Sequence, residues 1–193
     1  MMSRFLIWEN SYVEGFCVLT GLKGFNQPWL LAKGVALANN WPSDATFSMS
    51  PDYPTDMKLS DQVFGGSYRV VSIRLKEALS SIDESSNIEF LPVSILNHKG
   101  RLASKDYFIM NPLDSIDCIN QDESGVIWNK IDTSMISSCE KLVLKEDAIP
   151  EGSVMFREKF MRNTILIRRD IADKLLSTEM SGLFFLEPSQ YTG

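Results

Sequence analysis

The chain has 193 residues, of which 44% are apolar and 23% are charged. This is ordinary for a soluble globular protein, and the length suffices for one domain, or two small ones packed together, with a substantial core. The formal net charge of −6 at pH 7 disfavours binding to nucleic acid, because the phosphates would repel the protein, and suits a basic partner.

The three cysteines, Cys17, Cys118 and Cys139, are odd in number and widely spaced. We therefore expect reduced, mostly buried thiols rather than a disulfide framework or a zinc site. The first apolar stretch, Phe5–Trp8, is too short for a signal-peptide core. No segment approaches the length of a membrane span, about 18 apolar residues, so we expect a cytoplasmic protein without a membrane partner.

The first third of the chain predicts a loop-rich lobe. Short strands are expected at Phe5–Trp8 and Val13–Leu19, whereas turn-forming Gly, Pro, Asn, Ser and Asp recur throughout residues 21–66. Large apolar side chains are interspersed there, and a disordered linker would lack them. We therefore predict one compact unit with two parts, a loop-rich N-terminal lobe (residues 1–66) and an α+β core (residues 67–193). The candidate anchors of the lobe are Trp29, Leu30, Leu31, Trp41, Phe47 and Tyr53.

A strand followed by a helix is expected at the start of the core. Tyr68–Val71 has the composition of a strand, and Ser72 is a suitable cap for a helix over Ile73–Ile82. The apolar residues of that helix recur at helical spacing, which predicts one buried face. The helix would end within residues 83–87.

The next two segments predict the central hairpin of the fold. Apolar, β-rich runs at Ile88–Ile95 and Tyr107–Met110 flank a polar turn at Asn97–Arg101. Pro92 lacks a backbone donor, which predicts a sheet edge or a bulge at that position.

The remainder of the chain predicts short strands and one further helix. An amphipathic helix is expected over Arg169–Met180, with Gly182 in the left-handed conformation at its end. The pattern of residues 131–139 is ambiguous. The mixture of elements predicts an α+β fold with an antiparallel-rich mixed sheet and few helices. The expected strands are Val126–Trp128, Lys141–Leu144, Val154–Arg157, Asn163–Arg168 and Leu183–Leu186.

The residues that usually carry catalysis are scarce. His98 is the one histidine, and it lies in a polar turn where we expect it to be solvated. A Ser–His–Asp or Cys–His arrangement would have to use it. One histidine and three scattered cysteines also cannot form a typical transition-metal site. We therefore predict no catalytic residues, no cofactor and no metal.

The densest acidic group has three interpretations. It could be a hard-metal or acid/base site, a solvated turn or helix N-terminus, or an acidic surface for a basic partner. Its spacing matches no EF-hand loop. The group consists of Asp114, Asp117, Asp122 and Glu123.

Arginines recur in the C-terminal part of the chain. They would either lie on a solvated face with salt bridges to Glu158, Asp170 and Asp173, or bind phosphate. These arginines are Arg157, Arg162, Arg168 and Arg169.

An ordered series of short segments over residues 27–186 resembles a known family. The least generic segment is Asn111-x-Leu113-x-x-Ile116-Asp117-Cys118, with Ser124 downstream. The other segments are Trp29-Leu30-Leu31-x-x-Gly34, Leu59-Ser60-Asp61, Val70-Val71-Ser72-x-x-Leu75, Ile88-Glu89-Phe90-Leu91-Pro92-Val93, Leu142-Val143-Leu144, Phe156-Arg157 and Ser181-Gly182-x-x-Phe185. Together they resemble the eleventh family of the Imm series, immunity proteins of bacterial polymorphic-toxin systems. One departure is Asn120, where such proteins usually have an acidic residue.

The resemblance implies a non-enzymatic protein that binds and neutralises a cognate toxin effector. Such toxins are often delivered by contact-dependent or type VI secretion. A cytoplasmic immunity protein implies a toxin that acts in the cytoplasm. The family implies no catalytic residues, and a shared Arg157 and Asp117 would form an ion pair inside the fold.

Two acidic segments are candidates for contact with the toxin. One is the loop over residues 40–61, and the other is the group at Asp114–Glu123. The alternative function is a small-ligand-binding or enzymatic domain that uses the Asp114–Glu123 group or the C-terminal arginines. A third possible function is that of a structural subunit in a larger assembly. No oligomeric state is predicted. The candidate contact residues are Asp44, Asp52, Tyr53, Asp56, Asp61, Asp114, Asp117, Asp122 and Glu123.

Overall fold

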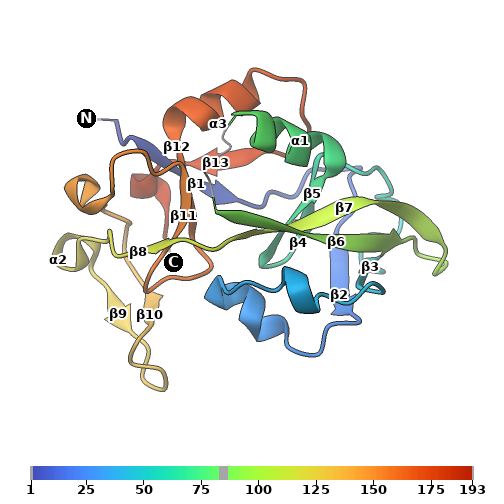
Figure 1. The fold of residues 1–193 in the computed structure, drawn as a ribbon, viewed down its shortest axis with the longest axis horizontal. Coiled ribbons are helices and arrows are strands. Elements are labelled where there is room, and N and C mark those ends of the chain that lie inside the picture. Colours follow the sequence, from blue (N-terminus) through green and yellow to red (C-terminus); the bar gives the residue numbers. More distant parts are fainter. Residues whose placement is uncertain (1, 83–86, 193) are drawn as a thin grey trace.

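A computed structural model describes residues 2–82 and 87–192, and two large sheets carry the fold (Figure 1). The six-stranded sheet has the order β2-β3-β6-β7-β5-β4, and the five-stranded sheet has the order β13-β1-β12-β11-β8. The strands of the first are β2 (Leu19–Lys23), β3 (Thr46–Met49), β4 (Gln62–Gly65), β5 (Tyr68–Ser72), β6 (Ile88–Leu96) and β7 (Leu102–Pro112). Those of the second are β1 (Phe5–Glu9), β8 (Ser115–Ile116), β11 (Met155–Glu158), β12 (Ile165–Arg168) and β13 (Phe184–Leu186).

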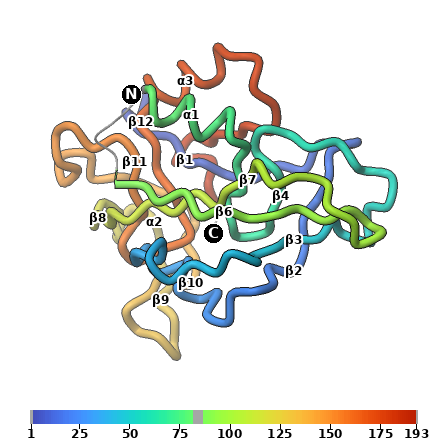
Figure 2. The backbone as a smooth tube through the Cα atoms, turned by 45° about the vertical axis from the view of Figure 1, so that its right-hand side comes forward, coloured from blue at the N-terminus to red at the C-terminus, as the bar shows by residue number. Residues whose placement is uncertain are grey.

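The predicted α+β class with antiparallel-rich sheets is confirmed. Within the two large sheets, the parallel pairs between named strands are β3 with β6 and β8 with β11. A separate two-stranded ribbon, β9 (Ile127–Trp128) with β10 (Ile136–Ser138), projects from the body in both backbone views (Figures 1 and 2). The helices are α1 (Ile73–Ile82), α2 (Gln121–Ser124), α3 (Arg169–Leu176) and the 3-10 helices η1 (Pro28–Lys33), η2 (Ala38–Asn40), η3 (Glu146–Ala148) and η4 (Pro188–Gln190).

The predicted hairpin, β6 with β7, lies at the centre of the six-stranded sheet. Pro92 is tolerated in β6 because β3 pairs only with Ser94, Ile95 and Leu96, so that no strand adjoins Pro92 on that side. The indole of Trp41 donates instead to the Pro92 carbonyl oxygen, at 2.8 Å. The register is irregular just beyond, between Val93 and Ile95. β6 is an interior strand, so it is not a sheet edge as a whole; the alternative prediction, a bulge, corresponds to the irregularity just after Pro92.

The helices α1 and α3 lie next to each other over one side of the molecule (Figures 1 and 2). The predicted cap of α1 is confirmed, since the Leu75 backbone N–H donates to the Ser72 hydroxyl at 3.2 Å. Apolar residues of both helices share one core cluster with the two sheets. Its members include Leu75, Leu79, Ile171, Leu175, Val71, Met110 and Ile167.

Several predicted boundaries are wrong. Helix α3 ends at Leu176 rather than Met180, because the hydroxyls of Ser177 and Thr178 take its last carbonyls. Gly182 has a left-handed φ of +80° but lies in a later turn. The predicted end of α1 at residues 83–86 lies outside the described residues.

Two predicted strands are also corrected. The segment Val13–Leu19 is a turn with isolated bridges, and its strand begins only at Leu19. The segment Lys141–Leu144 wraps around α2 instead, where Asn120 and Ser124 bond to Val143. The backbone groups of Val143 therefore bond to the N-cap and the last residue of α2 rather than to a neighbouring strand. The ambiguous residues 131–139 contain β10.

The first 66 residues contribute to both large sheets. Strand β1 lies between β12 and β13, and β2 to β4 supply the two edges of the six-stranded sheet. Of the expected anchors, Phe47 is buried and Trp41 is partly buried against the same core, whereas Trp29 is 56% exposed. The division of the chain at residue 66 stays a prediction.

All three cysteines are buried and none forms a disulfide within the described part of the chain, as predicted. Burial raises the pKa of the Cys17 thiol to about 12 and also raises that of Cys118. No helix among residues 2–82 and 87–192 is long and apolar enough to cross a membrane.

We expect Gly182→Ala to reduce the free energy of unfolding by at least about 3 kcal/mol. A Cβ at Gly182 would overlap the Gln62 carbonyl oxygen, at the start of β4. Gly100→Ala is the matched control, because Gly100 has a φ of +70° with nothing within 4 Å, so it should cost only the backbone term of roughly 1–2 kcal/mol. Urea denaturation of both variants measures the difference, and equal losses would contradict this account of the turn.

Candidate functional site

The candidate contact residues fall into two groups that the structure keeps apart. Those of residues 44–61 flank β3 and the start of β4, whereas those of residues 114–123 follow β7 through β8 to α2. Figure 1 shows β8 and α2 at one end of the long axis and β3 toward the other. The two groups therefore form separate surfaces.

Asp56 and Asp61 have internal structural partners. Asp56 is buried, and its carboxylate accepts hydrogen bonds from the Tyr12 hydroxyl at 2.9 Å and the Gly15 backbone N–H at 3.2 Å. Asp61 accepts from the Ser72 hydroxyl at 2.9 Å and from the Ser181 backbone N–H at 2.9 Å. Asp61 thereby orients the cap of α1 and holds the turn before β13 against β4.

The rest of the first group is exposed. Asp44, Asp52 and Tyr53 lie at the surface, and the ring of Tyr53 packs against that of Tyr12 with 5.2 Å between centroids. The hydrogen bond from the Tyr12 hydroxyl to the buried Asp56 carboxylate holds the Tyr12 ring in place. The first group therefore has two exposed carboxylates and an exposed tyrosine, which packs against Tyr12.

All four acidic residues of the second group, Asp114, Asp117, Asp122 and Glu123, are exposed. Asn120, the departure from the family pattern, is the N-cap of α2: its side chain accepts from the Glu123 backbone N–H at 3.4 Å and donates to the Glu123 carboxylate at 2.8 Å. Two acidic residues thus occupy the first turn, where the helix dipole favours negative charge. Within the described chain, no grouping of His, Cys, Asp or Glu could hold a metal ion.

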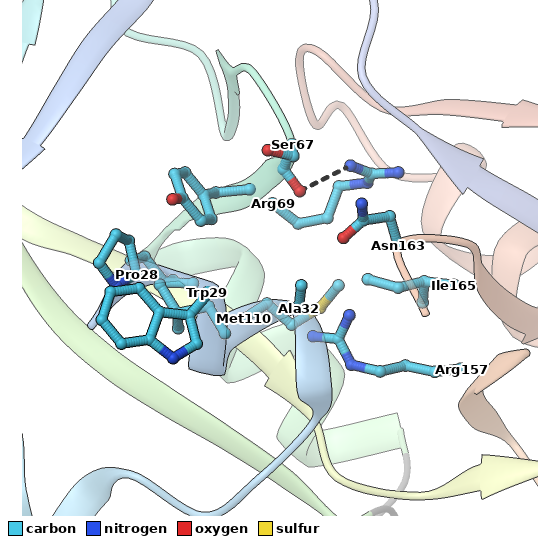
Figure 3. A pocket seen from close by; sticks show the side chains of 12 residues that line it. Pro28, Trp29, Ala32, Ser67, Arg69, Met110, Arg157, Asn163 and Ile165 are labelled. Carbon is cyan, nitrogen blue, oxygen red and sulfur yellow. Dashed lines mark hydrogen bonds between the residues drawn. The ribbon is translucent and has the colours of Figure 1, made fainter. Parts of the chain in front are cut away.

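A cleft of about 240 Å³ lies between the two large sheets, covered by η1 (Figure 3), and no local sequence pattern predicted it. Apolar side chains form much of its lining, and the polar part consists mainly of Arg69 from β5, Arg157 from β11 and Asn163. In the view of Figure 3, the amide of Asn163 lies between the two guanidinium groups. Trp29 and Pro28 of η1 also line it, and Trp29 is exposed.

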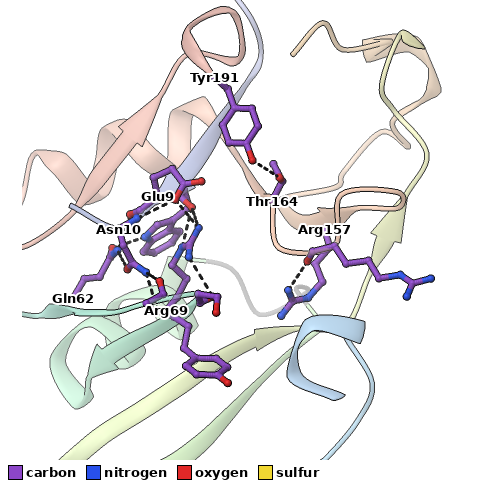
Figure 4. Close-up of polar contacts among 12 residues, drawn as sticks. Glu9, Asn10, Gln62, Arg69, Arg157, Thr164 and Tyr191 are labelled. Atoms are coloured by element: carbon purple, nitrogen blue, oxygen red, sulfur yellow. Dashed lines mark hydrogen bonds and ion pairs between the residues drawn. The ribbon is translucent and has the colours of Figure 1, made fainter. Parts of the chain in front are cut away.

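Arg69 connects β5 to β1 of the other sheet. Its guanidinium donates to the Trp8 carbonyl oxygen at 3.0 and 2.7 Å and forms an ion pair with Glu9 at 3.0 Å (Figure 4). Gln62 completes this network, since its amide donates to the Glu9 carbonyl oxygen at 2.7 Å and accepts from the Trp8 indole. Burial lowers the pKa of Arg69, and the Glu9 carboxylate opposes that effect.

Arg157 makes the reciprocal connection, from β11 to β7. It donates to the Pro112 carbonyl oxygen at 2.9 Å, the Asn111 side-chain oxygen at 3.1 Å and the Arg162 carbonyl oxygen at 2.7 Å. No carboxylate in the described part of the chain pairs with it, so the expected ion pair with Asp117 is wrong. Burial, with a further contribution from Arg69, lowers the pKa of Arg157 to about 10.

A glycine allows η1 to cover Arg157. Gly34 ends η1 with a left-handed φ of +61°, and a Cβ there would lie 3.0 Å from the Arg157 Cδ and 3.1 Å from the Pro112 carbonyl oxygen. Segments that carry the family resemblance, those with Trp29, Gly34, Asn111 and Arg157, therefore meet at this cleft.

Two further C-terminal arginines, Arg168 and Arg169, form ion pairs away from the cleft lining. Arg168 pairs with Asp170 at 2.6 Å, which confirms one predicted salt bridge, and Arg169 pairs with Glu187 at 2.8 Å. The predicted partner Glu158 is instead buried, and its carboxylate accepts from the Phe160 and Met161 backbone N–H groups. Burial raises the pKa of Glu158.

His98 is half-buried rather than fully solvated. Its Nε2 lies 3.1 Å from the Ser50 carbonyl oxygen, so it ties the β6–β7 turn to the end of β3. This contact gives His98 a structural role.

One family model matches the chain: the family described as Immunity protein family (Imm11) matches residues 22–189. The matched region extends from β2 to η4 and contains the cleft and both acidic surfaces. No curated protein matches the chain significantly.

We expect Asp56→Ala to reduce the free energy of unfolding by about 2 kcal/mol, because it removes the hydrogen bonds that the buried carboxylate accepts from Tyr12, Gly15 and Thr55. Asp52→Ala, the control on the same surface, should change it by less than about 0.5 kcal/mol. Urea denaturation of the two variants makes the comparison. A stable Asp56→Ala variant would return Asp56 to the candidate contact residues.

Proposed function

Because this chain belongs to the Imm11 family of immunity proteins, we propose that it protects a bacterium by binding a cognate toxin directly and neutralising it. The family match over residues 22–189 carries the proposal. The toxin would reach its target by contact-dependent or type VI delivery and act in the cytoplasm, where this protein would meet it.

The α2 surface is the proposed site of first contact with the toxin. We define it by Asp114, Asp117, Asp122 and Glu123, which are exposed and have no ion pair with any residue that the structure describes. The surface around β3 retains only Asp44 and Asp52 as exposed carboxylates, because Asp56 and Asp61 serve the fold. A denser unpaired charge attracts a basic partner more strongly, which favours the α2 surface.

A small-ligand function is the second candidate, and one observation favours it. The cleft between the sheets presents two buried guanidinium groups to a space of about 240 Å³. The acidic group at Asp114–Glu123, in contrast, has the geometry of a turn and a helix start.

Co-expression tests the immunity proposal. The product of the neighbouring gene is induced in a bacterium with and without this chain, and the two proteins are tested for co-purification. We expect toxicity that this chain relieves, together with a recovered complex. Relief without a complex would instead indicate an enzyme that reverses the damage, and absence of relief from a toxic product would contradict the proposal for that pair.

Charge-neutral variants test the contact surface. We expect Asp122→Asn/Glu123→Gln to slow association several-fold at low salt and to weaken its salt dependence, because these charges steer a basic partner. Asp44→Asn/Asp52→Asn removes the same number of charges from the other surface and should change the association rate much less. Stopped-flow mixing at two ionic strengths gives both rates. The reverse ranking would move the contact to the surface around β3.

A further inference from the structure

The cleft between the sheets has more positive than negative charge. Two buried guanidinium groups face it, with exposures of 4% for Arg69 and 6% for Arg157. Arg69 has the Glu9 carboxylate, whereas Arg157 has three neutral oxygen acceptors. A buried charge is costly unless an opposite charge compensates it. The charge of Arg157 is therefore uncompensated within the described part of the chain.

Hydrogen-bond donors also remain free in the cleft. A guanidinium group has five N–H donors, and the contacts of Arg157 use its Nε, Nη1 and Nη2 once each. Asn163 is exposed at the cleft, and its side-chain amide has no hydrogen-bond partner among residues 2–82 and 87–192. Both side chains can thus donate to an incoming oxygen atom.

We propose that this cleft binds one oxyanion, a carboxylate or a phosphate group, through Arg157 and Asn163. Arg69 adds a second positive charge close enough to affect Arg157. The apolar lining, which includes Ile109, Met110 and Ile165, lowers the local dielectric constant and strengthens the attraction. The site goes beyond the immunity proposal and does not depend on it.

The size of the cleft limits what it holds. Sites for drug-sized molecules usually span about 300–1,000 Å³, whereas this cleft is about 240 Å³. It therefore accommodates a single anionic group rather than a whole nucleotide. The exposed indole of Trp29 beside the cleft offers a flat apolar surface to whatever carries that group.

The test uses the isolated full chain, titrated with inorganic phosphate, acetate and the neutral isostere acetamide. Nitrogen-15 NMR follows the Arg157 Nε–H and the Asn163 side-chain amide. We expect saturable shifts of both signals with phosphate or acetate and none with acetamide. The proposal is overturned if neither phosphate nor acetate produces a saturable shift, or if acetamide produces shifts of the same size.

Asn163→Asp is the diagnostic variant, because it places a carboxylate in the cleft and should weaken anion binding at least tenfold. Asn39→Asp makes the same charge change at an exposed position outside the cleft lining and should leave binding within twofold. Equal affinities in the two variants overturn the proposed site. Arg157→Gln is a second test, in which a folded variant should lose the shifts; Asn163→Asp decides the matter if that variant does not fold.

A competition experiment identifies the source of the oxyanion once the site is established. With a toxin recovered by co-expression, saturating phosphate or Asn163→Asp weakens the complex at least tenfold if an acidic toxin side chain occupies the cleft. An unchanged complex assigns the site to a free small anion. The NMR titration requires no toxin, so its result stands whether or not the immunity proposal fails.

Discussion

Two buried arginines join the two large sheets, one in each direction. Arg69 extends from the six-stranded sheet to the backbone of β1, and Arg157 extends from the five-stranded sheet to the end of β7. Each guanidinium donates to a backbone carbonyl oxygen of the other sheet, Arg69 to Trp8 of β1 and Arg157 to Pro112 of β7. The relative position of the sheets depends on these contacts, because buried carbonyl groups must be paired and a planar guanidinium can bond several at once.

The same arrangement has an electrostatic consequence. Neutral oxygen atoms orient Arg157 but do not cancel its charge, so a positive site remains inside a protein whose net charge is −6. A surface of basic residues would be screened by solvent, whereas a charge between two packed sheets acts in a medium of lower dielectric constant. The fold therefore produces a local anion site that the overall charge conceals.

The acidic surfaces differ from the cleft in that their charges are negative and exposed to solvent. The α2 surface lies beside one end of the five-stranded sheet, on short elements with few regular hydrogen bonds, and its carboxylates point to solvent. Such a surface can vary in detail without disturbing the core, which suits the proposed binding to one particular toxin. The proposed toxin contact and the proposed anion site thus lie in different parts of the molecule and place different demands on the sequence.

Local patterns in the chain were enough to predict the elements whose signals span a few residues, whereas the contacts between distant groups depend on the fold. Helix α1, its Ser72 cap, the β6–β7 hairpin and the family resemblance follow from spacing and turn chemistry within a few residues. Residues 141–144 look like a strand yet form only one isolated bridge, between Leu144 and Ile119. Asp56 and Asp61 look like surface carboxylates yet hold loops in place. The cleft needs Arg69, Arg157 and η1, which are remote in the chain. The spacing of residues within a segment indicates which of its faces is apolar. A hydrogen bond or an ion pair depends in addition on a partner, and the position of that partner is set by the whole fold.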